Sequence, residues 1–184
     1  MDSKLWKRLD AITKAFQAEK SQDLKQIGND SIEEAAIESS PEMANLSVIA
    51  YCLYKMSSKN HFVRNRKWDA VKNSILLHLH KSRKGLEKEN FGKFKKNLHN
   101  VINSIQKIDH ELSNYARDLH EKAKIKQAST AYASGVSLSQ AAALTGADKK
   151  EVQRYIGITR IHDEQEAFYD LEERLKKLKE LLAQ

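Results

Sequence analysis

An uninterrupted heptad pattern in the middle of the chain constrains the fold most. Apolar residues there recur at spacings that alternate strictly between four and three: Phe94, Leu98, Val101, Ile105, Ile108, Leu112, Tyr115 and Leu119. Such spacing keeps one apolar seam of a helix turned toward a partner helix. We therefore expect a helix that is about 39 Å long over these residues. The partner is either the N-terminal part of the same chain or a second copy, and the pattern leaves both open.

The scarcity of helix-breaking residues extends this expectation to the whole chain. The 184 residues include one proline and six glycines, so few positions force a helix to end. With 40% hydrophobic residues, the composition is typical of a globular protein rather than a disordered one. Cys52 is the single cysteine, which excludes an internal disulfide, and no apolar run approaches the roughly 20 residues of a membrane span. We expect an all-α, cytoplasmic protein without membrane contact.

Capping signals indicate where helices of the N-terminal part begin and end. Ser40 followed by Pro41 predicts a helix start, because serine accepts hydrogen bonds from unpaired amides and proline has no amide to satisfy. Gly28 and Gly85 are expected to end the helices that precede them. Trp68 lies on the apolar stripe of a helix expected from about residue 62 to 83, and we expect it in the core. Residues 1–85 are thus predicted to form a helical bundle.

A second apolar pattern lies near the C-terminal end of the sequence. Its members are Phe168, Leu171, Leu175, Leu178 and Leu182. Two heptads are marginally stable alone, so this helix is expected to pack on the long helix or on its own symmetry mate. We predict a long coiled-coil-like helix over 86–133, a short leucine-rich amphipathic helix over 161–184, and a homodimer held through one of the two seams.

Residues 134–160, between the two seams, have capping signals in place of a heptad pattern. Ser137 with Gln140, and Asp148 with Glu151, have the spacing of capping boxes, so each pair predicts the start of a short helix. The first helix is expected over 138–144 and the second from Asp148 to just before Gly157. A three-residue turn, Thr145 to Ala147, would join them.

The spacing of Ala142, Gly146 and Val152 resembles the helix-turn-helix of bacterial and archaeal DNA-binding proteins, most closely the resolvase and homeodomain-like type. The small residue, the turn glycine and the inward apolar residue match that motif over residues 134–160 only. Ala141 and Ala147 are smaller than the residues usual at these positions of the motif. The helix-turn-helix should therefore pack against a third helix. That helix would contribute Ala128, Ala131 and Tyr132.

The resemblance implies which side chains would meet DNA. Gln153 and Arg154 would read base edges, since glutamine and arginine pair with adenine and guanine. Lys149 and Lys150, at the start of the recognition helix, would contact phosphates. Ser137 and Ser139 of the supporting helix would be weaker phosphate donors.

A strongly basic stretch precedes the motif. Residues 61–134 hold 16 Lys or Arg against 7 Asp or Glu. The predicted phosphate-binding residues of this stretch are Arg64, Arg66, Lys67, Lys81, Arg83, Lys84, Lys93, Lys95 and Lys96. Such density favours salt-dependent binding of nucleic acid without sequence preference. The positive excess lies beside the helix-turn-helix rather than on it.

Motifs typical of enzymes and metalloproteins are missing from the sequence. It has no glycine-rich phosphate loop, no catalytic-triad spacing and no convincing cluster of histidines, so we predict no catalytic residues, no metal and no cofactor. The favoured interpretation is a DNA-binding protein, a transcriptional regulator that reads the major groove. The alternatives are a helical adaptor or scaffold, and an RNA-binding, ribonucleoprotein-associated protein that uses the basic 64–96 stretch.

Overall fold

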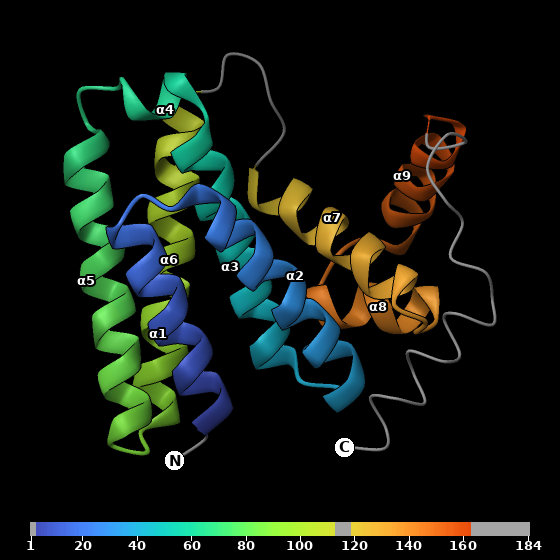
Figure 1. The fold of residues 1–184 in the computed structure, drawn as a ribbon, viewed down its shortest axis with the longest axis horizontal. Helices are drawn as coiled ribbons and strands as arrows, with labels where there is room; N and C mark the ends of the chain where they lie inside the picture. Colours follow the sequence, from blue (N-terminus) through green and yellow to red (C-terminus); the bar gives the residue numbers. More distant parts are fainter. Residues whose placement is uncertain (1–2, 113–118, 163–184) are drawn as a thin grey trace.

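The computed structural model describes residues 3–112 and 119–162, and within these ranges it is helical without any strand, as the sequence predicted. The helices are α1 (Ser3–Gln17), α2 (Ser21–Glu38), α3 (Pro41–Ser58), α4 (Asn60–Val63), α5 (Trp68–Glu87), α6 (Phe91–Leu112), α7 (Leu119–Ala133), α8 (Leu138–Thr145) and α9 (Lys149–His162). Figure 1 shows α1, α5 and α6 on one side, α2 and α3 in the middle, and α7 to α9 on the other side. No described helix has the length and apolar composition needed to cross a bilayer.

The two most extensive helix pairings are α2 with α3 and α5 with α6. Ser40 caps α3 as predicted, because its hydroxyl oxygen accepts a hydrogen bond from the Met43 amide at 3.3 Å. Cys52 is fully buried in the middle of α3. The core extends without a break from α1 to α9, so the described helices form one packed body.

Gly28 does not end a helix, contrary to the sequence prediction. It is buried within the continuous helix α2, where a side-chain Cβ would lie 3.4 Å from the Ser47 carbonyl oxygen of α3. The Ser31 hydroxyl donates to the Ile27 carbonyl at 2.6 Å within the same helix. The glycine therefore permits close packing of α2 on α3.

Gly85 has a similar role at the turn between α5 and α6. Helix α5 continues past it to Glu87, and a Cβ at Gly85 would lie 2.8 Å from the Phe94 amide nitrogen. The helix also begins later than expected, at Trp68, after the separate short helix α4. Trp68 is 6% exposed and meets the Phe16 ring edge to face, which places it in the core as predicted.

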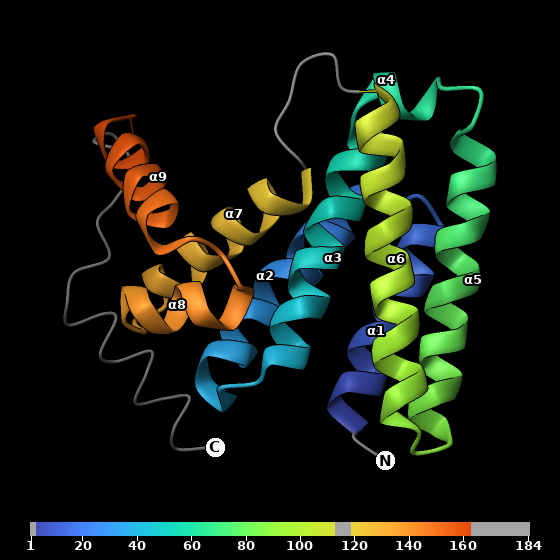
Figure 2. The ribbon, with the colours of Figure 1, turned by 180° about the vertical axis from the view of Figure 1, so that it is seen from behind.

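The heptad seam packs within the chain over the described part of α6. Phe94, Leu98, Val101 and Ile105 are all buried, and α5 is the main partner of α6. Where one long helix was predicted over 86–133, the described residues form two helices: α6 packs mainly on α5, whereas α7 packs mainly on α8, α3, α2 and α9. Figure 2 shows that α6 and α7 run in different directions. The leucine-rich pattern of residues 163–184 lies outside the described residues.

Candidate nucleic-acid interface

Helix α8 begins with the predicted capping box. The Ser137 hydroxyl oxygen accepts a hydrogen bond from the Gln140 amide, and the Gln140 side-chain oxygen accepts one from the Ser137 amide, both at 3.2 Å. The Ser137 hydroxyl oxygen therefore caps the helix, and Ser137 and Ser139 are both exposed. Helix α8 extends to Thr145, one residue beyond the predicted end.

A tight turn at Gly146 joins α8 to α9. Gly146 has a φ of +67°, a left-handed conformation that L side chains rarely adopt. The Ala147 amide donates to the Ala142 carbonyl at 3.0 Å, which closes the end of α8. No atom lies within 4 Å of a Cβ built on Gly146, so the backbone conformation, and not space, requires glycine here.

Helix α9 begins where the sequence predicted but ends later than predicted. Its start is as expected, since the Asp148 carboxylate accepts from the Glu151 amide at 3.0 Å. The predicted end before Gly157 is wrong, because α9 continues through Gly157 to His162. Nothing lies within 4 Å of a Cβ at Gly157, so neither a close contact nor a left-handed φ demands glycine at this position.

Helix α7 supports the α8–α9 pair, which is the role that the sequence assigned to a third helix. Ala128 and Ala131 of α7 are fully buried, and Tyr132 is half-buried against the core. From the other side, Ala142 and Val152 are buried. Helix α8 also contacts α3 and α2, so the α8–α9 pair is anchored to the main body.

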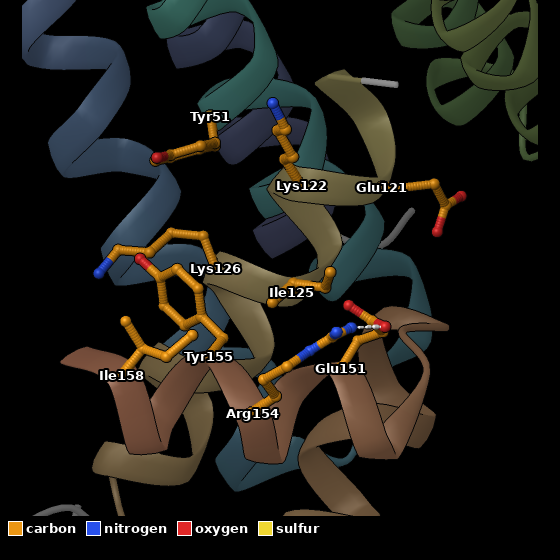
Figure 3. Close-up of a pocket in the computed structure, with 9 residues that line it drawn as sticks. All are labelled: Tyr51, Glu121, Lys122, Ile125, Lys126, Glu151, Arg154, Tyr155 and Ile158. Carbon is orange, nitrogen blue, oxygen red and sulfur yellow. Dashed lines mark hydrogen bonds and ion pairs between the residues drawn. The ribbon is translucent and has the colours of Figure 1, made fainter. Parts of the chain in front are cut away.

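The predicted base- and phosphate-contacting residues of α9 lie on its surface but do not all face the same way. Lys149, Lys150 and Gln153 are exposed near the N-terminus of the helix. Arg154 forms an ion pair with Glu151 and lines a hollow between α9 and α7. Figure 3 shows Arg154 and Glu151 turned toward each other on this side of α9. All four predicted residues of α9 are thus exposed, and Arg154 is the one that pairs with a carboxylate of the same helix.

The predicted basic stretch does not form one surface. Arg64, Arg66 and Lys67 belong to the connection between α4 and α5, whereas the other predicted residues surround the turn between α5 and α6. Helix α5 has 20 residues and separates the two groups by about 30 Å. Along the longest axis of the molecule, both groups lie at one end and α9 lies at the other (Figures 1 and 2).

Arg83 and Lys95, which were predicted to bind phosphates, form ion pairs with other helices. Arg83 pairs with Asp10 of α1 at 2.6 Å, and Lys95 pairs with Glu42 of α3 at 2.8 Å. The predicted residues that stay exposed around the α5–α6 turn are Lys81, Lys84, Lys93, Lys95 and Lys96, of which Lys95 forms the ion pair with Glu42. Two of the side chains that the sequence analysis assigned to phosphate binding therefore form ion pairs between packed helices instead.

The hollow between α3, α7 and α9 has no counterpart in the sequence analysis. It has a volume of about 370 Å³, and Tyr51, Ile125, Tyr155 and Ile158 form much of its apolar wall. Burial, together with the neighbouring Tyr155, raises the pKa of Tyr51 to about 12. The residues come from three helices that are far apart in the sequence, so no local pattern could indicate this hollow.

Comparisons of the chain with protein-family models, with curated proteins and with solved structures found no match. Among the described residues, no group of three or more His, Cys, Asp or Glu is arranged to hold a metal ion. What the α8–α9 pair binds therefore has to follow from its own geometry and charge.

Proposed function

We propose that the protein binds duplex DNA and inserts α9 into the major groove. The observation that carries the proposal is the exposure of Lys149, Lys150 and Gln153 near the N-terminus of a helix fixed to the body by the Gly146 turn and by α7. A major groove admits a helix whose N-terminal side chains reach base edges. The proposed role is that of a transcriptional regulator.

Each exposed side chain has a distinct task in this proposal. Lys149 and Lys150 contact phosphate oxygens, and the positive end of the helix dipole assists them. Gln153 donates to and accepts from an adenine edge. Arg154 reaches a guanine only after it exchanges Glu151 for the base, because the two side chains are paired in the structure.

The homodimer remains part of the proposal. The first seam is buried within the chain from Phe94 to Ile105, so the second seam, in residues 163–184, is the one proposed to join two copies. A two-fold axis between two copies of α9 would present them to successive major grooves about 34 Å apart. The expected target is then a palindromic site.

Selection from random duplex oligonucleotides at two salt concentrations tests the proposal. A recovered motif is expected, and Gln153→Ala should weaken binding to it by about 1–3 kcal/mol and relax the preference at one position. Lys149→Ala and Lys150→Ala should each weaken binding to all sequences and lower the salt slope by about 1. Lys107→Ala, on the exposed face of α6, is the matched control and should bind like the parent. Unchanged site preference and salt slope in all α9 variants would refute the proposal.

A second candidate function is binding of structured RNA at the α5–α6 turn. The observation that favours it is the group of exposed lysines there, Lys81, Lys84, Lys93 and Lys96. Ammonium groups clustered at one end of a helical hairpin attract phosphates without sequence preference. If Lys84→Ala with Lys93→Ala abolishes retention of a structured RNA while the α9 variants leave it unchanged, this candidate replaces the first.

A further inference from the structure

The hollow between α3, α7 and α9 has the size of a small-molecule site. Its volume of about 370 Å³ lies within the range of about 300–1,000 Å³ that ligand pockets occupy. Figure 3 shows Tyr51 reaching it from α3, Ile125 and Lys126 from α7, and Tyr155 and Ile158 from α9. Ile158 is 53% exposed and stands as a large apolar side chain that the described part of the chain leaves partly uncovered.

Some charged side chains around this hollow form ion pairs within the described part of the chain, and others do not. Glu121 pairs with Lys124 at 2.7 Å, and Glu151 pairs with Arg154. Among the residues that the structure describes, no carboxylate forms an ion pair with Lys122 or Lys126. Lys126 is half-buried, and its Nζ lies 5.9 Å from the centroid of the Tyr155 ring. The hollow therefore offers a partly buried cation to an incoming anion.

Hydroxyl groups accompany this cation. In Figure 3 the Tyr51 and Tyr155 hydroxyls lie on the same side of the hollow as the Lys126 ammonium group, and Glu121 points to the opposite side. A phenol hydroxyl is protonated at neutral pH, so the Tyr51 hydroxyl is a hydrogen-bond donor, and burial raises its pKa further, to about 12. An ammonium group beside a phenol donor is a good partner for a carboxylate.

We propose that this hollow binds a small aromatic carboxylate. The carboxylate accepts hydrogen bonds from the Lys126 ammonium group and the Tyr51 hydroxyl, and the aromatic ring packs against Ile125 and Ile158 beside Tyr155. A flat apolar body suits the aliphatic and aromatic walls, whereas a single anionic group suits the one half-buried lysine. The groups proposed to hold the carboxylate, Lys126 and Tyr51, belong to α7 and α3, so this site does not depend on the proposed binding of DNA.

Titration calorimetry of the full chain with 2-naphthoate tests the site, and 2-naphthylmethanol serves as the uncharged analogue. We expect 2-naphthoate to bind with a Kd of about 1 mM or tighter and the alcohol to bind at least about tenfold more weakly. Lys126→Met keeps the aliphatic stem and removes the charge, so it should weaken 2-naphthoate about tenfold or more and leave the alcohol unchanged. Lys107→Met, at an exposed position of α6 that does not line the hollow, should bind as the parent does.

A second variant keeps the proposal testable if Lys126→Met perturbs folding. Ile158→Glu places a carboxylate at a largely exposed position of the apolar wall, so the fold should tolerate it while binding of 2-naphthoate is lost. Circular dichroism of each variant checks the helical content. Three results would overturn the proposal: no heat of binding with the parent, equal affinity for acid and alcohol, or parent-like affinity in both Lys126→Met and Ile158→Glu.

Discussion

At the scale of single residues, Gln127 in α7 is the group whose burial is least compensated. Its side chain is fully buried, and neither the amide nitrogen nor the amide oxygen has a hydrogen-bond partner among the described residues. A polar group buried without a partner costs about 1–3 kcal/mol of stability. Since neither polar atom of the buried Gln127 side chain has a partner in the described part of the chain, an apolar side chain of similar shape suits the position better.

Gln127→Met should therefore raise the free energy of unfolding by about 1–3 kcal/mol, because it removes both unpaired atoms and nearly preserves the volume. Urea unfolding followed by circular dichroism measures this change. Gln22→Met, at an exposed position of α2, is the control and should change the stability by less than about 0.5 kcal/mol. A loss of stability in Gln127→Met would mean that the amide has a partner in solution.

At the scale of helices, the caps and the turn glycine Gly146 were predictable, whereas the roles of Gly28, Gly85 and Gly157 were not. Ser40, Ser137 and Asp148 cap the helices that their sequences predict, because a cap depends on amides within three residues. Gly28 and Gly85 were interpreted as helix ends, yet their roles depend on helices distant in the sequence that approach them closely. A glycine alone does not reveal whether it provides a left-handed φ or space for a neighbour.

Gly146 and Gly157 provide a matched test of this distinction. Gly146→Ala should lower the stability by about 1 kcal/mol or more, because alanine is strained at a φ of +67°. Gly157→Ala should raise it by about 0.5–1 kcal/mol, because alanine is the better helix former and the space around this position is open. Thermal unfolding of both variants measures the two changes. Equal effects of the same sign would contradict the assigned roles.

Sequence alone predicted some parts of the candidate sites better than others. Features set by local helical spacing were predictable, whereas features set by contacts between distant helices were not. The exposure of Lys149, Lys150 and Gln153 follows from helical spacing after a capped start, so the sequence was sufficient. The pairing of Arg83 with Asp10 and the hollow beside Tyr51 depend on contacts between distant helices. Neither leaves a periodic signal in the sequence.

At the scale of the whole molecule, ion pairs attach α1 to two of its neighbours, α5 and α2. Asp10 accepts from Lys14 of the same helix and from Arg83 of α5, and Arg8 pairs with Glu34 of α2 at 3.0 Å. The hydrogen bond from Lys14 and that from Arg83 hold the pKa of Asp10 below its ordinary value of 3.8, although burial opposes the shift. The ionised carboxylate thus stabilises the contact between α1 and α5.

This lowered pKa gives the stability a specific dependence on pH. A carboxylate whose folded pKa lies below the unfolded value stabilises the fold above the unfolded value, and the contribution is lost as the pH falls through the folded value. Asp10→Asn should therefore cost about 1 kcal/mol near neutral pH, and the difference from the parent should shrink at about pH 3 and below. Urea unfolding at both pH values measures this. Glu33→Gln, at an exposed position of α2, should show no such convergence.

The burial of Cys52 has a consequence for the chemistry of the intact molecule. This thiol is the single one in the sequence and is fully buried within α3. An alkylating or oxidising reagent can reach it only when α3 separates from the helices around it. The rate of thiol modification in native buffer is consequently governed by how often the core opens, and an oxidised sulfur would record a past unfolding event rather than a redox signal sensed by the folded chain.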